Sequence, residues 1–373
     1  MKRTNSLFAS YISFTMSVYL FFLFFLTMRY KEKKEISGFK VNKLAQTEFQ
    51  QEEKSESTFE KTESKEDILF TYKWKDYQDE VYNISFSLSK KSMAEAEAEF
   101  GYFEDELKKF LDESLSGIRE EMISYLKRIA LQLIAESKYP QYFLIEQTDP
   151  KNFKIKISVP PSLYEEVKPE YMKISNKIKS EQISYLKKIE NLEKKLIESY
   201  LQKKAIIVRS GKLFPDYQLI VKNNRPRINE IIEALMKTKK KITLFQFLEV
   251  NLSFIQEIEY GIPPLKEGNK IILGFWPPLK VFANNLGDCD SKAIAFATLW
   301  TSYRKFPLIL IMIPNHMFIG VAVPSTTGQE FVINGLRYTL FEVTGKEKIP
   351  PGIISSYSRF YLERGHYNYQ IIK

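Results

Sequence analysis

The longest uninterrupted apolar stretch of the chain runs from Leu7 to Met28 and holds neither a charged residue nor a proline. A run of this length is long enough to cross the hydrocarbon core of a bilayer as a helix. A cleaved signal peptide is the alternative, but the run is long and no small-x-small cleavage site precedes Arg29. The pattern therefore predicts an uncleaved transmembrane anchor at residues 7–28, behind a short tail at residues 1–6.

The orientation of this anchor stays open. The basic residues after the span slightly outnumber those before it, which favours a cytoplasmic body. The short N-terminal tail is instead typical of a signal anchor that exports the rest of the chain. We expect a single-pass membrane protein whose soluble body is exported. Residues 29–66 are mostly Lys, Glu, Ser, Gln and Thr, and such a segment predicts a flexible charged linker.

Regular periodicity returns in residues 67–239. Apolar and polar residues alternate from Tyr82 to Leu88 and again from Phe153 to Val159, which predicts two half-buried strands. Between them, apolar residues recur at helical steps from Phe103 to Leu133, and a second helical stripe runs from Ile178 to Tyr200. We expect a small β-sheet with long amphipathic helices that pack as a hairpin or coiled coil.

The pattern changes again in residues 240–373. A helix is predicted from Phe245 to Ile258, and a second helix, apolar on nearly every side, begins at Cys289. A helix of this kind is buried at the centre of a domain. Asn334-Gly335 indicates a tight hairpin. The predicted fold class is α+β, with this helix packed on an antiparallel sheet whose strands lie at Leu308–Ile313, Met317–Val323, Phe331–Ile333 and Arg337–Val343.

Composition excludes several classes of function. The net charge of +9 and the pI of about 9.1 come from lysines spread along the chain, and no short basic motif with interleaved aromatics predicts nucleic-acid binding. The sequence has no glycine-rich phosphate loop and no dinucleotide fingerprint. With one cysteine and two widely spaced histidines it predicts no metal site, no cofactor and no internal disulfide.

Three residues in order carry candidate chemistry. Cys289 opens the buried helix, His316 begins a predicted strand, and Glu342 lies in another strand-like stretch. Thiol, imidazole and carboxylate are the components of a Cys-His-acid nucleophilic site. A lone cysteine in an apolar helix is more often a small core residue, and the second histidine, His366, fits a structural or exposed role. The three residues together favour a catalytic triad.

The surroundings of Cys289 suit a nucleophile. A helix N-terminus lowers the pKa of a thiol, and Gly287 allows a sharp turn into the helix. Asp288 and Asp290 are suited to capping the helix. Because two carboxylates beside the sulfur would raise its pKa, we expect both to face away from it.

The other two residues have complementary roles. His316 accepts the thiol proton and later returns it to the leaving group, while Glu342 holds the second ring nitrogen. The backbone N–H of Cys289 is one donor for an oxyanion. The second donor is left open among Asn284, Asn285 and Trp276. Asn315, beside the histidine, is a further polar candidate for positioning the ring.

These segments resemble the bacterial transglutaminase-like superfamily, which contains transglutaminases and related cysteine peptidases. The resemblance covers residues 240–344, with a weaker match at Gly211–Tyr217. It implies a papain-like C-terminal domain and a triad of Cys289, His316 and Glu342, with Glu where many relatives have Asp. The matching segments are Phe254–Tyr260, Gly287–Ala293, Asn315–Val321 and Arg337–Thr344.

Chemistry and resemblance together lead to one main expectation. A membrane-anchored thiol hydrolase would attack amide or peptide bonds of a protein or peptide through an acyl-enzyme thioester. One alternative is an acyltransferase that crosslinks proteins with the same triad. The other is a catalytically inactive membrane-tethered scaffold, with a protein partner bound at the long helices.

Overall fold

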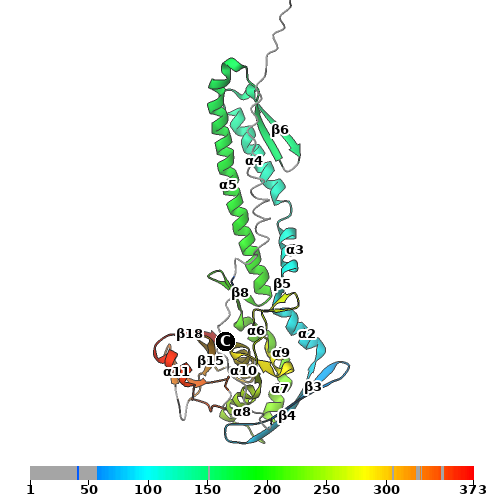
Figure 1. The fold of residues 1–373 in the computed structure, drawn as a ribbon, viewed down its shortest axis with the longest axis vertical. Coiled ribbons are helices and arrows are strands. Elements are labelled where there is room, and N and C mark those ends of the chain that lie inside the picture. The colour runs from blue at the N-terminus through cyan, green and yellow to red at the C-terminus, as the bar shows by residue number, and fades with distance from the viewer. Residues whose placement is uncertain are drawn as a thin grey trace, which may run out of the picture. The chain divides into compact units, whose positions relative to one another are not determined.

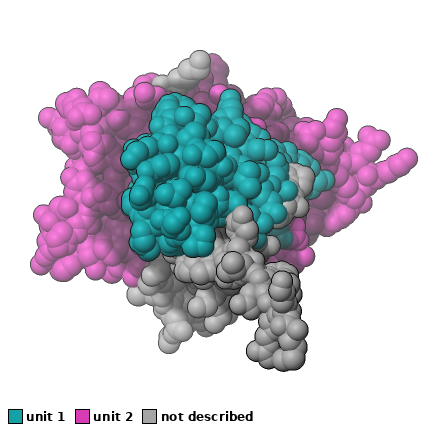
Figure 2. Space-filling view, turned by 90° about the horizontal axis from the view of Figure 1, so that it is seen from above, with its two compact units in different colours: residues 1–38, 107–198 teal, residues 39–106, 199–373 magenta. Residues whose placement is uncertain are grey.

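The computed structural model describes residues 40–41 and 57–373, apart from 150–151, 305, 325–327, 329 and 346–347. The chain divides into two compact units, residues 1–38 with 107–198 and residues 39–106 with 199–373 (Figure 2). The predicted tail, the predicted anchor and most of the predicted linker lie outside the described residues. Within the part of the chain that is described, no helix is long and apolar enough to cross a membrane.

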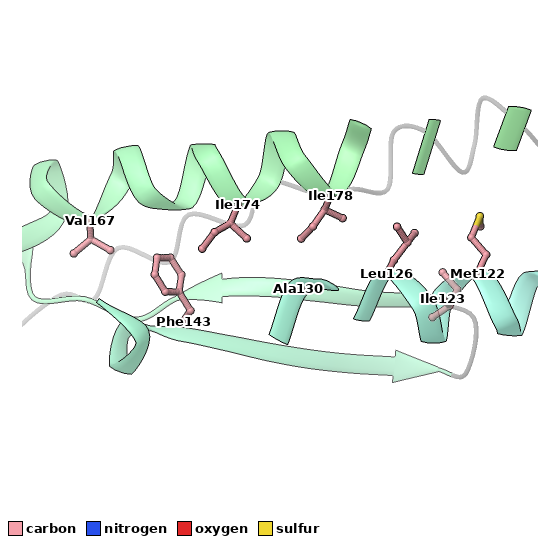
Figure 3. Close-up of a cluster of buried hydrophobic side chains, with 8 residues drawn as sticks. All are labelled: Met122, Ile123, Leu126, Ala130, Phe143, Val167, Ile174 and Ile178. Atoms are coloured by element: carbon pink, nitrogen blue, oxygen red, sulfur yellow. The ribbon is translucent and has the colours of Figure 1, made fainter. Parts of the chain in front are cut away.

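The first unit contains helix α4 (Ile118–Ala135), the hairpin of β6 (Phe143–Asp149) and β7 (Asn152–Ile157), and most of helix α5 (Tyr164–Lys203) (Figure 1). The 3-10 helices η2 (Pro140–Tyr142) and η3 (Pro161–Leu163) precede β6 and α5. The two helices and the hairpin share one core. The hairpin contains the strand predicted at Phe153–Val159, but the strand predicted at Tyr82–Leu88 belongs to the second unit, so the single small sheet expected in residues 67–239 is divided. The core side chains are Met122, Ile123, Leu126, Ala130, Phe143, Val167, Ile174 and Ile178 (Figure 3).

The single helix predicted from Phe103 to Leu133 is two helices, α3 (Glu104–Ser114) and α4. Gly117 separates them with a backbone φ of +77°, a left-handed conformation that cannot continue a right-handed helix. The apolar stripe continues on both sides of the break, so periodicity alone did not reveal it. A further short helix, α2 (Lys90–Glu99), precedes this region.

Helix α10 (Cys289–Tyr303) lies at the centre of the second unit. Every residue from Cys289 to Thr301 is buried, as the apolar pattern predicted. The elements packed around it are α6 (Tyr217–Asn224), α8 (Leu244–Glu257), α9 (Pro278–Asn284) and β15 (His316–Val321).

An antiparallel sheet of five strands, in the order β16-β17-β15-β14-β18, completes an α+β architecture. Four of its strands were predicted, and Asn334 and Gly335 adopt the positive φ values of 49° and 80° that their tight turn requires. The edge strand β18 was not predicted. The other strands are β14 (Leu308–Ile313), β16 (Glu330–Ile333) and β17 (Leu336–Phe341), and β18 spans Asn368–Ile372.

A second antiparallel sheet joins β2 (Thr58–Glu63), β3 (Asp67–Lys75) and β4 (Val81–Ser89). Strand β2 falls within the stretch predicted as a flexible linker. It is ordered because it pairs along its whole length with β3 and because Phe59 packs on Tyr72, with ring centroids 4.8 Å apart.

Strand β3 packs on helix α8 of the same unit. The Trp74 ring lies 5.3 Å from that of Phe254, and its Nε1 donates to Ser253 Oγ at 3.0 Å. The Tyr72 hydroxyl donates to the carbonyl of Phe282. A boundary was expected between residues 239 and 240, but the structure groups residues 39–106 and 199–239 with 240–373. The reason is that β3 supplies part of the core around α8.

The remaining elements are short. They are β1 (Lys40–Val41), β5 (Tyr102–Phe103), β8 (Ile206–Arg209), β9 (Lys212–Pro215), η4 (Arg225–Arg227), α7 (Asn229–Met236), β10 (Glu259–Tyr260), β11 (Lys266–Glu267), β12 (Lys270–Ile271), β13 (Leu286–Gly287) and α11 (Ser356–Glu363).

The contact between β3 and α8 can be tested by the substitution Trp74→Ala. We expect it to lower the free energy of unfolding by about 3–5 kcal/mol, because a large buried ring is replaced by a cavity. Urea titration followed by near-UV circular dichroism measures the change. The control Val81→Ala removes a side chain on β4 that is 53% exposed and should leave the midpoint unchanged. Equal midpoints for both variants would contradict a shared core.

Candidate active site

Cys289 is the first residue of α10, and its side chain is buried, with 5% exposed. Asp288 is the N-cap of the helix, and its Oδ1 accepts from the N–H of Ser291 at 3.3 Å. The predicted capping role of Asp288 is therefore present. The thiol lies at the N-terminal end of a helix whose whole first turn is in the core.

The Sγ atom of Cys289 lies against the beginning of β15. The backbone N–H groups of Met317 and Asp290 bond the sulfur and favour the thiolate. Burial nevertheless raises the pKa of the thiol well above its usual value, and the charges of Asp290 and Asp288 raise it further. The resting site therefore holds a protonated thiol at neutral pH, because desolvation outweighs the two backbone donors.

Asp288 and Asp290 accept hydrogen bonds from other groups, yet their charges still raise the pKa of the thiol. Tyr217 donates its hydroxyl to Oδ2 of Asp290 at 2.8 Å, and the N–H of Ser291 donates to Oδ1 of Asp290 at 2.8 Å. Burial raises the pKa of Asp288 well above its usual value, and the charge of Asp290 raises it further. The two carboxyl groups flanking the thiol thus favour its neutral form.

His316 and Glu342 form the polar pair that the sequence predicted. Nε2 of His316 lies 2.5 Å from Oε1 of Glu342, whose side chain is 1% exposed. A carboxylate can only accept, so Nε2 carries the hydrogen and Nδ1 of a neutral ring keeps a lone pair. Because His316 precedes Met317, whose N–H bonds the thiol, the imidazole is next to the residue that contacts Sγ.

Helix α11 and its N-cap residue donate hydrogen bonds to the second carboxylate oxygen of Glu342. Oε2 accepts from the hydroxyl of Ser358 at 2.8 Å and from the N–H of Ser355 at 3.4 Å. Ser355 is also the N-cap of α11 and accepts from the N–H of Ser358. Both oxygens of the buried acid are therefore engaged, which leaves Oε1 directed at the histidine.

Gln256 is a functional candidate that sequence reasoning missed. Its Nε2 donates to the carbonyl oxygens of Glu342 and Ile349, both at 2.8 Å, and so ties the end of α8 to the backbone of the acid. Its Oε1 is buried and has no hydrogen-bond partner among the residues that the structure describes. An amide in a mostly apolar helix was the available signal, although α8 also buries Asn251 and Ser253.

Lys292 is a second missed residue, one turn along α10 from the thiol. Its side chain is 1% exposed, and Nζ donates to the carbonyls of Ile258 at 2.6 Å and Gln256 at 3.4 Å. Burial lowers the pKa of Lys292 to about 7, while the charge of Glu257 acts in the opposite direction. The lysine therefore joins the C-terminal end of α8 to the helix that carries the nucleophile.

The candidates for a second oxyanion donor differ in their exposure and in their hydrogen-bond partners. Asn284 is exposed, and Asn285 is buried, with no partner for its Oδ1 in the described part of the chain. The ring N–H of Trp276 donates to Oε1 of Glu267 at 2.8 Å. Asn315, with a φ of 59°, serves the turn between β14 and β15. Among the described residues, no group of three or more His, Cys, Asp or Glu side chains is placed to hold a metal ion.

The structure thus pairs His316 with Glu342 and places Cys289 against Met317, the residue after the histidine. The catalytic role of the three residues stays a prediction. In comparisons with known proteins, no family model, no curated protein and no solved structure matches the chain. The interpretation of the site therefore depends on its own geometry.

The two hydrogen bonds that Gln256 donates to backbone carbonyls can be tested by Gln256→Met, which keeps the approximate size of the side chain. One buried and one partly buried carbonyl lose their donor, so we expect the free energy of unfolding to fall by about 1–3 kcal/mol. Removal of Oε1, which has no partner among the described residues, partly offsets this loss. Thermal or urea unfolding measures this loss. The control Gln202→Met, at an exposed position, should behave as wild type. A wild-type midpoint for Gln256→Met would contradict the assignment.

The buried ammonium of Lys292 predicts a specific pH dependence. Its pKa is lowered in the folded state, so the unfolded chain binds more protons between pH 7 and 10.5, and stability rises with pH across that window. Between pH 7.5 and 9.5 the wild type should gain about 2–3 kcal/mol relative to Lys292→Met, which has no such group.

Urea midpoints of both proteins at several pH values measure this difference. Lys91→Met replaces a lysine whose side chain is 87% exposed and should follow the wild-type curve. If the curves of wild type and Lys292→Met run parallel, the ammonium is not perturbed by burial and the prediction is wrong.

Proposed function

We propose that this chain is a membrane-anchored thiol hydrolase that cleaves amide or peptide bonds through Cys289, His316 and Glu342. The observation that carries the proposal is the 2.5 Å contact between Nε2 of His316 and Oε1 of Glu342. The residue after His316 is Met317, and its backbone N–H bonds the thiol. Burying a glutamate is costly unless its oxygens are hydrogen-bonded, and here one of those bonds orients the imidazole. The uncharged run at residues 7–28 supports the anchor.

The raised pKa of the thiol makes general-base catalysis the appropriate mechanism. Nδ1 of His316 takes the thiol proton as Sγ attacks the carbonyl carbon of the amide. The tetrahedral intermediate then expels the amine, which receives that proton from the imidazolium, and a thioester remains on Cys289. Water, deprotonated by the same histidine, hydrolyses the thioester, while Glu342 stabilises the imidazolium that forms in each step.

The α+β arrangement of a buried cysteine helix on an antiparallel sheet supports the resemblance to the transglutaminase-like superfamily. Such a domain would extend beyond the expected limit at residue 240, because β3 contributes to the core around α8. The resemblance remains part of the proposal.

Transfer of the acyl group to an amine is the second candidate. The 5% exposure of Cys289 favours it, because a thioester at a buried sulfur is partly shielded from bulk water. Adding a primary amine to the acyl-enzyme distinguishes the two activities. An amide product would assign acyl transfer, and release of the free acid alone would assign hydrolysis.

An inactive scaffold is the third candidate, and the raised thiol pKa favours it. A neutral, buried thiol has little nucleophilicity of its own. The enzyme and scaffold proposals differ in whether His316 accelerates reaction at Cys289.

The test uses the full-length chain and p-nitrophenyl acetate, with the adduct on Cys289 measured by mass spectrometry over time. Because the chain has one cysteine, a thiol adduct reports on one site. We expect His316→Ala to slow acylation by about 10²–10⁴-fold, the usual contribution of a general base. In the same variant, alkylation by iodoacetamide should have a midpoint above the free-thiol pKa of about 8.5.

His366→Ala is the matched control, since His366 is the second histidine of the chain and is exposed. It should acylate at the wild-type rate. Equal acylation of wild type and His316→Ala would show that thiol and imidazole do not act together, and the scaffold interpretation would then stand.

A further inference from the structure

The hydroxyl of Ser358 lies between helix α11 and the buried carboxylate of the His316–Glu342 pair. It donates to Oε2 of Glu342 at 2.8 Å, and the exposed fraction is 0% for the serine and 1% for the glutamate. The N–H of Ser355 donates to the same oxygen at 3.4 Å, which is a longer contact. The Ser358 hydroxyl is therefore the main donor to Oε2, and bulk water does not reach the oxygen to replace it.

Capping of α11 does not require this hydroxyl. Ser355 is the N-cap, and its Oγ accepts from the backbone N–H of Ser358 at 3.0 Å. In α6 the same bond runs from the N–H of Leu219 to the N-cap Asp216, so a residue without a side-chain donor can occupy this position. A buried hydroxyl costs free energy unless it is hydrogen-bonded, and the partner of the Ser358 hydroxyl is the acid.

The hydrogen bonds around Ser358 run in one direction. Ser355 donates its hydroxyl to Oγ of Ser358 at 2.9 Å, and the single hydroxyl hydrogen of Ser358 is used on Glu342. Nε2 of His316 lies 2.5 Å from the other carboxylate oxygen and donates to it. Hydrogen bonds linked in this way polarise and strengthen one another. The carboxylate is thus held between a serine and an imidazole.

Helix α11 is anchored on the sheet that carries His316. Ile354, just before the helix, belongs to the hydrophobic core cluster of β14 and β15. Tyr357 donates its hydroxyl to the carbonyl of Pro314, two residues before the histidine, at 3.0 Å. Because the helix packs on the sheet, Ser358 is held in a fixed position relative to the imidazole, as a residue that orients a reactive group must be.

We propose that Ser358 is a positioning residue, which directs Oε1 of Glu342 at Nε2 of His316 and thereby fixes Nδ1 as the nitrogen that takes the thiol proton. This inference rests on the proposed function. The serine keeps its own proton throughout the reaction. Without its hydroxyl, Oε2 keeps only the 3.4 Å contact with the N–H of Ser355, and the carboxylate can rotate away from the ring.

Ser358→Ala removes the hydroxyl and keeps the N–H that completes the cap of α11. In the full-length chain we expect acylation by p-nitrophenyl acetate to fall by about 10–100-fold, the effect of losing one hydrogen bond to a charged group. The fall should be smaller than for His316→Ala, which loses the base itself. Ser356→Ala is the matched control, because it makes the same change at an exposed position of α11, and it should acylate at the wild-type rate.

Nitrogen NMR of the full-length chain, with isotope-labelled histidine rings, separates a positioning role from a structural one. The chain has two histidines, so two rings are observed. In the wild type, Nε2 of His316 should carry the proton, whereas in Ser358→Ala we expect both tautomers of this ring. The ring of His366 lies 6.5 Å from that of Tyr361 on α11, so it reports on the packing of the helix and its signals should not change.

Wild-type acylation by Ser358→Ala would overturn the role of Ser358 and leave the proposed function intact. A fall in acylation with unchanged His316 signals would also overturn it, because the ring would then keep its tautomer without the serine. Altered signals from both histidines would overturn it too, since the serine would then only support the fold. If the wild type itself forms no acyl adduct, the proposed function fails, and the role of Ser358 in it fails as well.

Discussion

Burial of the first turn of α10 is the constraint on which the second unit depends. A helix N-terminus presents unpaired N–H groups, and here it also carries two aspartates, a serine and a lysine into the core. Asp288 caps the helix itself, and the other three side chains have partners from other elements. These partners are Tyr217 of α6 for Asp290, the backbone of Trp276 for Ser291, and the carbonyls that end α8 for Lys292. The position of the thiol therefore follows from hydrogen bonds that the fold must make in any case.

The acid of the candidate triad depends on a second set of partners. Glu342 receives bonds from α11 at its side chain and from Gln256 at its backbone, so a residue just beyond β17 is held by elements before and after it in the chain. The imidazole lies in turn on β15, in the middle of the sheet. Rigid elements thus hold both groups, which is the arrangement expected where geometry controls proton transfer.

Local pattern was enough to predict α10, α8 and four strands of the five-stranded sheet, because each is a distinctly apolar segment of the sequence. It was also enough to propose Cys289, His316 and Glu342, since few residues of the chain have the required chemistry. The contacts of Gln256 and Lys292 could not be predicted, because each joins segments at least 34 residues apart in the chain. The break at Gly117 was missed because the stripe on its two sides remains in phase.

The packing of β3 on the core around α8 and α9 has a consequence for how the chain is made. Tyr72 and Phe282 are separated by 210 residues, so the aromatic face of β3 leaves the ribosome long before the surface that covers it. At typical rates of synthesis this interval is about 10–40 s. During that time Phe70, Tyr72 and Trp74, all buried in the finished fold, have no cover from the C-terminal part of their own unit. A nascent chain with such a face is a natural client for chaperones.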